Sequence, residues 1–166
     1  VGADYTQLAN MLAVQDFKAA NKETAERMLW VARRDEKSSL RTQDIKNFPC
    51  RDLCTIDQLW LASSDYKFGF SVQKQIWFDI GGKLNQFIES DWETYCKFCE
   101  FVEWRKKGGE WLVYDKLCWD LRGVLGHLPA TFCDGTTVAS VRLGFLFSRV
   151  ATCKLWEDPK NKIFSF

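Results

Sequence analysis

The stretch FPCRDLCTIDQLWLASSDYKFGFSVQKQIW, residues 48–77, decides the fold because it is dense in helix caps, turns and aromatic residues. Thr55 and the glutamine three residues later match a capping box, which predicts a short helix beginning at Ile56. Ser71 is placed to cap a second helix, which Gly81-Gly82 ends. We therefore expect a helix, a turn and a second helix, with an aromatic surface between them.

Apolar residues at helical spacing predict further helices on both sides of this stretch. The expected helices are a pair capped near Asp4 and Asn21, a turn over 40–45, a short face over 84–88, one from Asp91 to Glu103, a small one capped by Asp115, and a last one from Thr136 or Thr137 to Cys153. A hairpin across VEW and WLVY is the alternative for residues 102–114. Pro129 and its neighbouring glycines exclude a helix from the loop before the last one.

The last predicted helix is apolar on more than one side. Val138 and Phe145 belong to one broad face, whereas Leu143 and Phe147 point elsewhere. We expect this helix either to be sandwiched in the core or to present Leu143 and Phe147 to something that the chain binds.

Length and charge bound the class of protein. The 166 residues suit a single domain, for which we expect residues 1–156, followed by a loose charged tail over 157–166. The net charge of +1 gives no overall field that would attract nucleic acid or an anionic membrane. No apolar run reaches the ~20 residues of a membrane span, and no leader precedes Tyr5.

The seven cysteines, an odd number, favour free thiols in a reducing compartment over a disulfide scaffold. Cys96 and Cys99 fall on the apolar face of their predicted helix, so they are expected in the core. A zinc site that joins them to Cys50 and Cys54, or a redox pair, is the alternative.

Catalytic patterns are scarce in this sequence. His127 is the single histidine, and its GHLP context is not a nucleophile elbow, so we expect it to bind backbone groups within a loop. Neither Gly-Gly pair has the spacing of a phosphate-binding loop. Asp52 and Asp57 stand where helix N-termini favour negative charge, which explains them without catalysis.

The composition instead indicates a binding function. Eight tryptophans and thirteen phenylalanines exceed what a core of this size can hide. Those expected to line loops are Phe48, Phe68, Phe70, Trp111, Trp119, Phe132 and Phe145. Arg41, Arg51, Arg142 and Arg149 lie beside these loops in the sequence and could pair with the carboxylates of a flat apolar ligand.

The runs FPCRDLCTIDQLW, FGFSVQKQIW, VEWRKKGGEWL, YDKL and GHLPA resemble the genomes-uncoupled-four family of tetrapyrrole-binding proteins, over about Tyr5 to Cys153. The resemblance implies an all-α domain likened to a cupped hand, with about seven or eight short helices and two long loops. It also implies binding of protoporphyrin IX and its magnesium complex, and stimulation of magnesium chelatase together with the large porphyrin-binding subunit of that enzyme. Family members are not enzymes themselves, and no protein-bound metal is expected.

In the family, two mobile loops build the porphyrin site, and they correspond here to Leu40–Thr55 and Trp119–Arg142. The candidate porphyrin-binding residues are Arg41, Phe48, Arg51, Leu53, Trp119, Leu128, Arg142 and Phe145. Arg142 is the candidate for the essential loop arginine. The sequence places no side chain as a ligand of the magnesium, and a water could serve instead.

The resemblance also implies a location and partners. The helical bundle that precedes this domain in cyanobacterial members is missing, which suggests an algal or plant chain trimmed to its mature core, and hence a chloroplast protein of the stroma. A role in plastid signalling is a further expectation from the resemblance. We expect a monomer, with peripheral contact to a membrane left open. The alternatives are a linear bilin as ligand, a pigment-independent interaction module, and an enzyme built on His127.

Overall fold

The computed structural model describes residues 2–35, 39–84 and 91–155, and every structural statement below refers to these residues. Its elements are α1 (Thr6–Ala13), α2 (Phe17–Val31), α3 (Thr42–Lys46), α4 (Cys50–Ser63), α5 (Phe70–Asp79), α6 (Asp91–Phe101), the 3-10 helix η1 (Tyr114–Lys116) and α7 (Thr137–Thr152). The described part holds no strand, and the alternative of a hairpin over residues 102–114 reduces to one bridge between Arg105 and Trp111. The all-α class is confirmed. The face expected over 84–88 and the tail over 157–166 lie largely outside the described residues.

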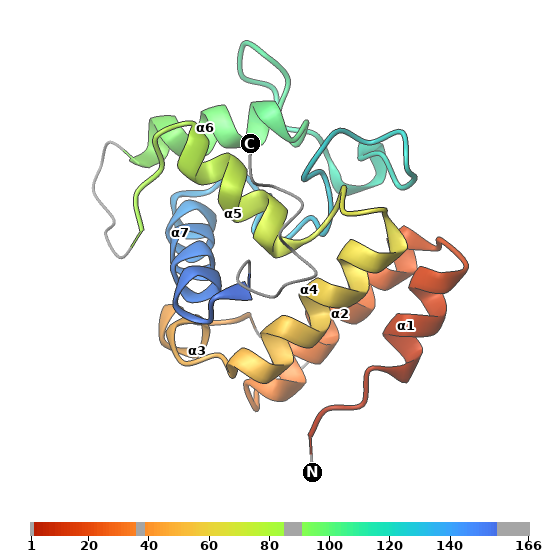
Figure 1. Cartoon of the computed structure of the whole chain (residues 1–166). Helices are drawn as coiled ribbons and strands as arrows, with labels where there is room; N and C mark the ends of the chain where they lie inside the picture. Colours follow the sequence, from red (N-terminus) through yellow and green to blue (C-terminus); the bar gives the residue numbers. More distant parts are fainter. Residues whose placement is uncertain (1, 36–38, 85–90, 156–166) are drawn as a thin grey trace.

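The helices form two groups that share one core (Figure 1). In the first group, α1 packs on both α2 and α4. There Trp60 of α4 stacks on Phe17 of α2, with ring centroids 5.9 Å apart, and its indole N–H donates to Thr24 Oγ1 at 3.0 Å. In the second group, α3, α5 and α6 surround α7, whose Phe147 ring lies 5.7 Å from that of Trp77.

The helix predicted to begin at Ile56 begins earlier, at Cys50. Pro49 occupies its N-cap with a φ of −60°, so the proline lies where its missing N–H costs nothing. Thr55 is inside the helix, where its hydroxyl donates to the Arg51 carbonyl at 2.9 Å, and so it caps nothing. Asp52 lies in the first turn, as expected, and accepts a hydrogen bond from Tyr5 Oη at 2.7 Å.

Asp57 caps a different helix from the one that carries it. The prediction that Ser71 caps α5 is wrong, because α5 begins at Phe70 and the Ser71 N–H donates to Asp57 Oδ1 at 2.9 Å. Gly69 precedes α5 with a φ of +141°, and a Cβ there would approach Asp57 Oδ1 to 2.9 Å. Asp57 is fully buried, and this burial raises its pKa to about 6. A buried carboxylate thus sets the α4–α5 turn.

The helix predicted to be capped by Asn21 begins earlier, at Phe17. Asp16, not Asn21, caps α2, and its carboxylate accepts from the Ala19 N–H at 3.1 Å. Asn21 lies inside the helix and is buried. Its side chain therefore bonds a distant segment of the chain, at Ala130.

Helix α7 has the predicted bounds, and Thr136 caps it by accepting from the Ala139 N–H at 3.0 Å. Leu143 and Phe147 are fully buried, as are Leu146 and Val150, whereas Val138 is 54% exposed. The Phe147 ring packs on Trp77 of α5 and Phe98 of α6. The prediction that α7 is sandwiched in the core is therefore confirmed, and the alternative that Leu143 and Phe147 face a partner is wrong.

Cys50 and Cys153 form a disulfide, which the sequence analysis did not predict. It joins the first residue of α4 to the C-cap of α7 across 103 residues of chain. A loop of that length removes up to about 4–5 kcal/mol of conformational freedom from the unfolded chain. Because Cys50 is bonded, the four-cysteine zinc alternative fails, and no cluster of metal ligands occurs in the described part of the chain.

The connection between α6 and α7 is long and irregular, yet buried polar groups hold its GHLPA segment in place. The Gln73 amide of α5 donates to the carbonyls of Gly126 and Pro129, both at 2.9 Å. His127 bonds backbone groups on both ring nitrogens, Cys118 N at 3.0 Å and Val102 O at 2.5 Å, as predicted. The prediction of a small helix capped by Asp115 is wrong: Asp115 lies inside the 3-10 helix η1, whose N-cap is Val113, and residues 117–121 are not helical.

We predict that Asp57→Asn removes one source of pH dependence from stability. The Asp57 pKa is raised in the folded state, so the folded state binds more protons than the unfolded state between about pH 4 and 6. The contribution of Asp57 to the free energy of unfolding therefore falls as the pH rises through this window, by about 2–3 kcal/mol.

Urea unfolding of both proteins at pH 4.5, 5.5 and 7 measures this contribution. The free energy of unfolding of the natural chain minus that of Asp57→Asn should decrease from pH 4.5 to 7. A difference that stays constant, or that rises with pH, would show that burial does not raise this pKa.

Candidate functional site

A cavity of about 810 Å³ opens between α2, the residues that precede α3, and the loop that precedes α7. Tyr114 of η1 and Arg142 of α7 complete its lining. Most of its wall is apolar, formed by Ala25, Met28, Leu29, Leu40, Ala130 and Phe132. A cavity of this size with mainly apolar walls and a few polar groups has the usual character of a small-molecule site.

Helix α2 provides one whole side of the cavity, because positions 18, 21, 22, 25, 28 and 29 share one helical face. Ala19 and Ala25 lie on this side. In the structure they border the cavity and leave room for its volume.

Asn21 joins α2 to the opposite wall. Its side-chain oxygen accepts from the Ala130 N–H at 2.7 Å, and its amide nitrogen lies 3.5 Å from the Ala130 oxygen. The same amide donates to Tyr114 Oη at 3.1 Å. One buried side chain thus sets the position of both the loop and the tyrosine relative to α2.

Tyr114 presents a phenol to the cavity. Its ring packs on the Trp119 ring, with centroids 4.6 Å apart, so the tryptophan lies behind it. Burial raises the Tyr114 pKa, and the hydroxyl stays protonated at neutral pH. Since its oxygen accepts from Asn21, its hydrogen can be donated to a ligand oxygen.

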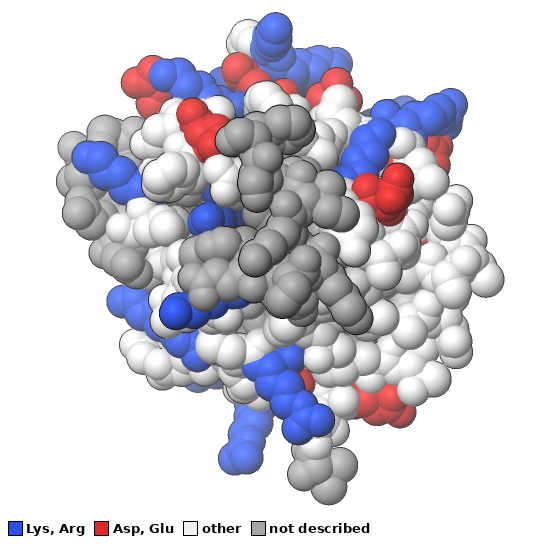
Figure 2. Space-filling view, viewed as in Figure 1, with Lys and Arg blue, Asp and Glu red and all other residues white. Residues whose placement is uncertain are grey.

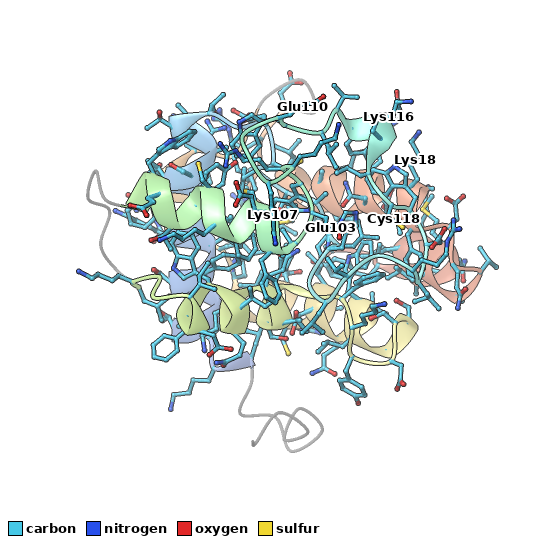
Figure 3. The ribbon with its side chains drawn as sticks, turned by 90° about the horizontal axis from the view of Figure 1, so that it is seen from above. Lys18, Glu103, Lys107, Glu110, Lys116 and Cys118 are labelled. Carbon is cyan, nitrogen blue, oxygen red and sulfur yellow. A yellow bond between two sulfur atoms is a disulfide. The ribbon has the colours of Figure 1, made fainter. Side chains whose placement is uncertain are left out.

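Three cations border the cavity. Lys18 pairs with Asp115 at 2.7 Å, and Figure 3 shows Lys18 on the same side of the molecule as Lys116 of η1. Lys22 is 3.7 Å from Glu26 in a weak pair along α2. Arg142 Nη2 donates to the Ser39 hydroxyl at 3.2 Å.

The two carboxylates of the lining already accept hydrogen bonds at the start of a helix, Asp16 as the cap of α2 and Asp134 from the cap of α7. Asp16 accepts the Ala19 N–H at the start of α2, and Asp134 accepts from the hydroxyl and the N–H of Thr136, at 2.6 and 3.0 Å. The cations are therefore the groups best placed to meet a charged ligand, and they favour an anionic one. On the face of the molecule shown in Figure 2, basic and acidic side chains are mixed.

Of the eight predicted porphyrin-binding residues, all of which the structure describes, Arg142 lines the cavity. Phe48, Leu53 and Leu128 are core residues with at most 1% of their surface exposed. Phe68 and Phe70, expected to line loops, are also buried in the core.

The other four predicted residues lie around the cavity or away from it. Arg41 follows the lining residue Leu40 and pairs with Asp44. Arg51 is exposed in the first turn of α4. Trp119 supports Tyr114, and Phe145 lies under Lys46, whose Nζ is 4.2 Å from the ring centroid.

None of the eight predicted binding residues lies on α2, although this helix forms one side of the cavity. Asn21 was interpreted as a helix cap, although a polar residue inside an apolar helical face is a signal of a buried polar contact. Of the two assigned loops, Leu40–Thr55 contributes only Leu40 to the lining, whereas Trp119–Arg142 contributes residues 130–134 and Arg142, which form the wall opposite α2. Much of the rest of Leu40–Thr55 is helical, in α3 and the start of α4.

We predict that Asn21→Ala destabilises the protein by about 2–3 kcal/mol, because it leaves the buried Ala130 N–H without its acceptor and the Tyr114 hydroxyl without its donor. Denaturant midpoints at constant m-value measure the loss. Asn10→Ala, on the exposed side of α1, is the matched control and should change the midpoint little. Equal effects of the two substitutions would contradict the bridging role of Asn21.

Residues 1–143 of the chain match the protein family described as GUN4-like. The ycf53 protein of Porphyra purpurea is 40% identical over 158 residues, which are 93% of this chain and 58% of that protein. The chloroplastic tetrapyrrole-binding protein of Arabidopsis thaliana is 29% identical over 129 residues, 75% of this chain and 47% of that protein. The chain thus spans about half the length of the curated relatives that it matches.

The fold has solved counterparts too. The ligand-free structure of Arabidopsis thaliana GUN4 superposes with a TM-score of 0.69 at 27% identity, covering 88% of this chain and 98% of that one. The resemblance inferred from the sequence motifs is confirmed by the family match and by this structural match.

Proposed function

The chain belongs to the GUN4-like family, and on this premise we propose that it binds a tetrapyrrole in the cavity between α2 and the loop that precedes α7. The observation that carries the proposal is an apolar cavity of about 810 Å³ with Arg142 and two lysines at its borders. Such a site suits a flat hydrophobic molecule that carries carboxylates.

The energetics are adequate for this ligand. Burial of several hundred Å² of apolar ligand surface contributes on the order of 10 kcal/mol, and association costs take several kcal/mol back, which leaves roughly micromolar affinity.

We assign the ligand to protoporphyrin IX and its magnesium complex, with a linear bilin as the alternative. Arg142 would pair with a propionate, and Tyr114 would donate a hydrogen bond to a ligand oxygen. The cavity lining holds no histidine, and water is our assignment for the axial ligand of magnesium. The absorbance spectrum after incubation with each pigment distinguishes a cyclic from a linear ligand.

The role that we propose is that of a carrier and regulator, not an enzyme. His127 is 1% exposed and bonds backbone groups on both nitrogens, so it lacks the access that a catalytic base needs. This geometry does not favour the enzyme alternative. We propose that the protein delivers its pigment to the large subunit of magnesium chelatase and stimulates that enzyme.

The relatives suggest where this happens. The Arabidopsis relative is named as chloroplastic, and we propose the chloroplast stroma for this chain as well. Among the described residues, no helix has the length and apolar character needed to cross a membrane.

We predict that Arg142→Glu weakens protoporphyrin IX binding at least about tenfold, because a charge-assisted hydrogen bond contributes about 1.5–3 kcal/mol and a carboxylate there repels the propionate. Arg142→Lys should lose less, since it keeps the charge. Tryptophan fluorescence quenching measures the affinity. Lys107→Glu, in the exposed turn before Trp111, makes the same charge change away from the cavity and should bind normally. No saturable quenching of the natural chain at micromolar pigment would refute the proposal.

A second prediction concerns the cavity volume. Ala25 is exposed and lines the cavity, so Ala25→Trp should fill it without disturbing the core and abolish pigment binding. Ala13→Trp, at the exposed end of α1, adds the same side chain elsewhere and should bind normally.

The same pair of variants tests the role in chelatase stimulation. Ala25→Trp should lose stimulation of magnesium chelatase in a reconstituted assay, and Ala13→Trp should retain it. Full stimulation by an Ala25→Trp protein that binds no pigment would favour the pigment-independent interaction module.

A further inference from the structure

Residues 39–50, which we call the strap, run along one side of α7 and connect two features that lie far apart in the fold. The first residues of the strap, Ser39 and Leu40, form part of the cavity wall. Its last residue, Cys50, carries the disulfide to Cys153. The strap includes α3, which packs on α7 (Figure 1).

Four contacts attach the strap to α7 in order along the helix. Arg142 bonds the Ser39 hydroxyl at 3.2 Å, and the Phe145 ring lies under Lys46 at 4.2 Å. Arg149 Nε donates to the Phe48 carbonyl at 2.7 Å, and Cys153 is bonded to Cys50. The helix residues are spaced by three and four, so they form one stripe along α7.

The disulfide is the one covalent contact among these four. The ring contact and the Arg142 contact are partly exposed, and such contacts are individually weak. A surface hollow of about 190 Å³ lies beside these contacts, lined by Lys46 of the strap and by Phe145, Ser148, Arg149 and Thr152 of α7. Leu40, Ile45 and Phe48 anchor the strap in the core, whereas the contacts at Ser39 and Lys46 are exposed, and the disulfide is the contact that a reductant can remove.

We propose that the Cys50–Cys153 disulfide is a redox clamp on the ligand cavity, closed when oxidised and loosened when a dithiol reduces it. Both cysteines are half-buried, so a reductant can approach the bond. A thiolate of the dithiol attacks one sulfur of the bond, releases the other cysteine as a thiol and forms a mixed disulfide. The second thiol of the reductant then attacks this mixed disulfide and releases the remaining cysteine. Two electrons and two protons pass to the protein, which ends with two thiols, and the reductant becomes a disulfide.

Reduction frees Cys50 from the end of α7, and the strap then departs more often from the helix stripe. The wall formed by Ser39 and Leu40 moves with it, and Arg142 loses its partner at the cavity border. We expect the reduced protein to bind the pigment about five- to tenfold more weakly, which is the usual size of coupling between two sites in one domain. This ligand effect rests on the proposed function, whereas the release of the strap does not.

The experiment compares the oxidised chain, the same chain treated with dithiothreitol, and the Cys50→Ser/Cys153→Ser variant. Hydrogen–deuterium exchange over residues 41–48 reports on the strap, where the Ile45, Asn47 and Phe48 amides are bonded within α3 and its end. Protoporphyrin IX titration reports on the cavity. Far-ultraviolet circular dichroism checks that each form is folded at the temperature used.

Reduction should speed exchange in the strap and raise the dissociation constant about five- to tenfold, and the double variant should match the reduced chain. Dithiothreitol should change nothing further in the double variant, which separates this bond from the other cysteines. Cys96→Ser, at a half-buried thiol on α6, is the matched control and should respond to reductant as the natural chain does.

Unchanged strap exchange on reduction of a folded chain would overturn the clamp, as would an equal dissociation constant for both redox forms. If no form binds protoporphyrin IX, the proposed function fails by itself. The exchange data then decide the clamp: faster exchange in the strap supports it, and unchanged exchange rejects it.

Discussion

The buried hydrogen bonds between Asn21 and Ala130 set the spacing on which the functional part of this structure depends. They hold an irregular loop against a helix while leaving the surface beside them open. The Asn21 side chain bonds both the N–H and the carbonyl of Ala130. Separating α2 from the loop would break both hydrogen bonds, and this cost fixes the distance between the two elements. The cavity exists because the two walls are joined at this point and do not collapse over the small residues of α2.

Other buried polar groups serve the same purpose elsewhere in the fold. Gln73 anchors the GHLPA segment from the α5 side, His127 anchors it from within, and Asp57 sets the turn between α4 and α5. All three act on backbone groups. These three polar side chains therefore position loops and turns, and the groups that can meet a ligand are the cations at the cavity border and the Tyr114 hydroxyl.

The sequence predicted the all-α class and most helices, because apolar spacing and caps act over a few residues. It failed where a side chain acts over a long distance. Asn21 and Asp57 are of residue types that often cap a nearby helix. Their actual partners, Ala130 and Ser71, are brought to them by the tertiary fold. Pairing of Cys50 with Cys153 depends on how α4 meets α7, which spacing along the chain does not reveal. The cavity was placed on loops, yet small residues of a helix form one of its sides, and their size alone could not distinguish packing from an opening.

The most direct test is a crystal structure of the chain with a magnesium porphyrin. This account predicts the macrocycle between α2 and the loop over residues 130–134, with a propionate within hydrogen-bond distance of Arg142. Pigment bound on another surface, with Asn21 and Ala130 still joined and the cavity empty, would contradict it.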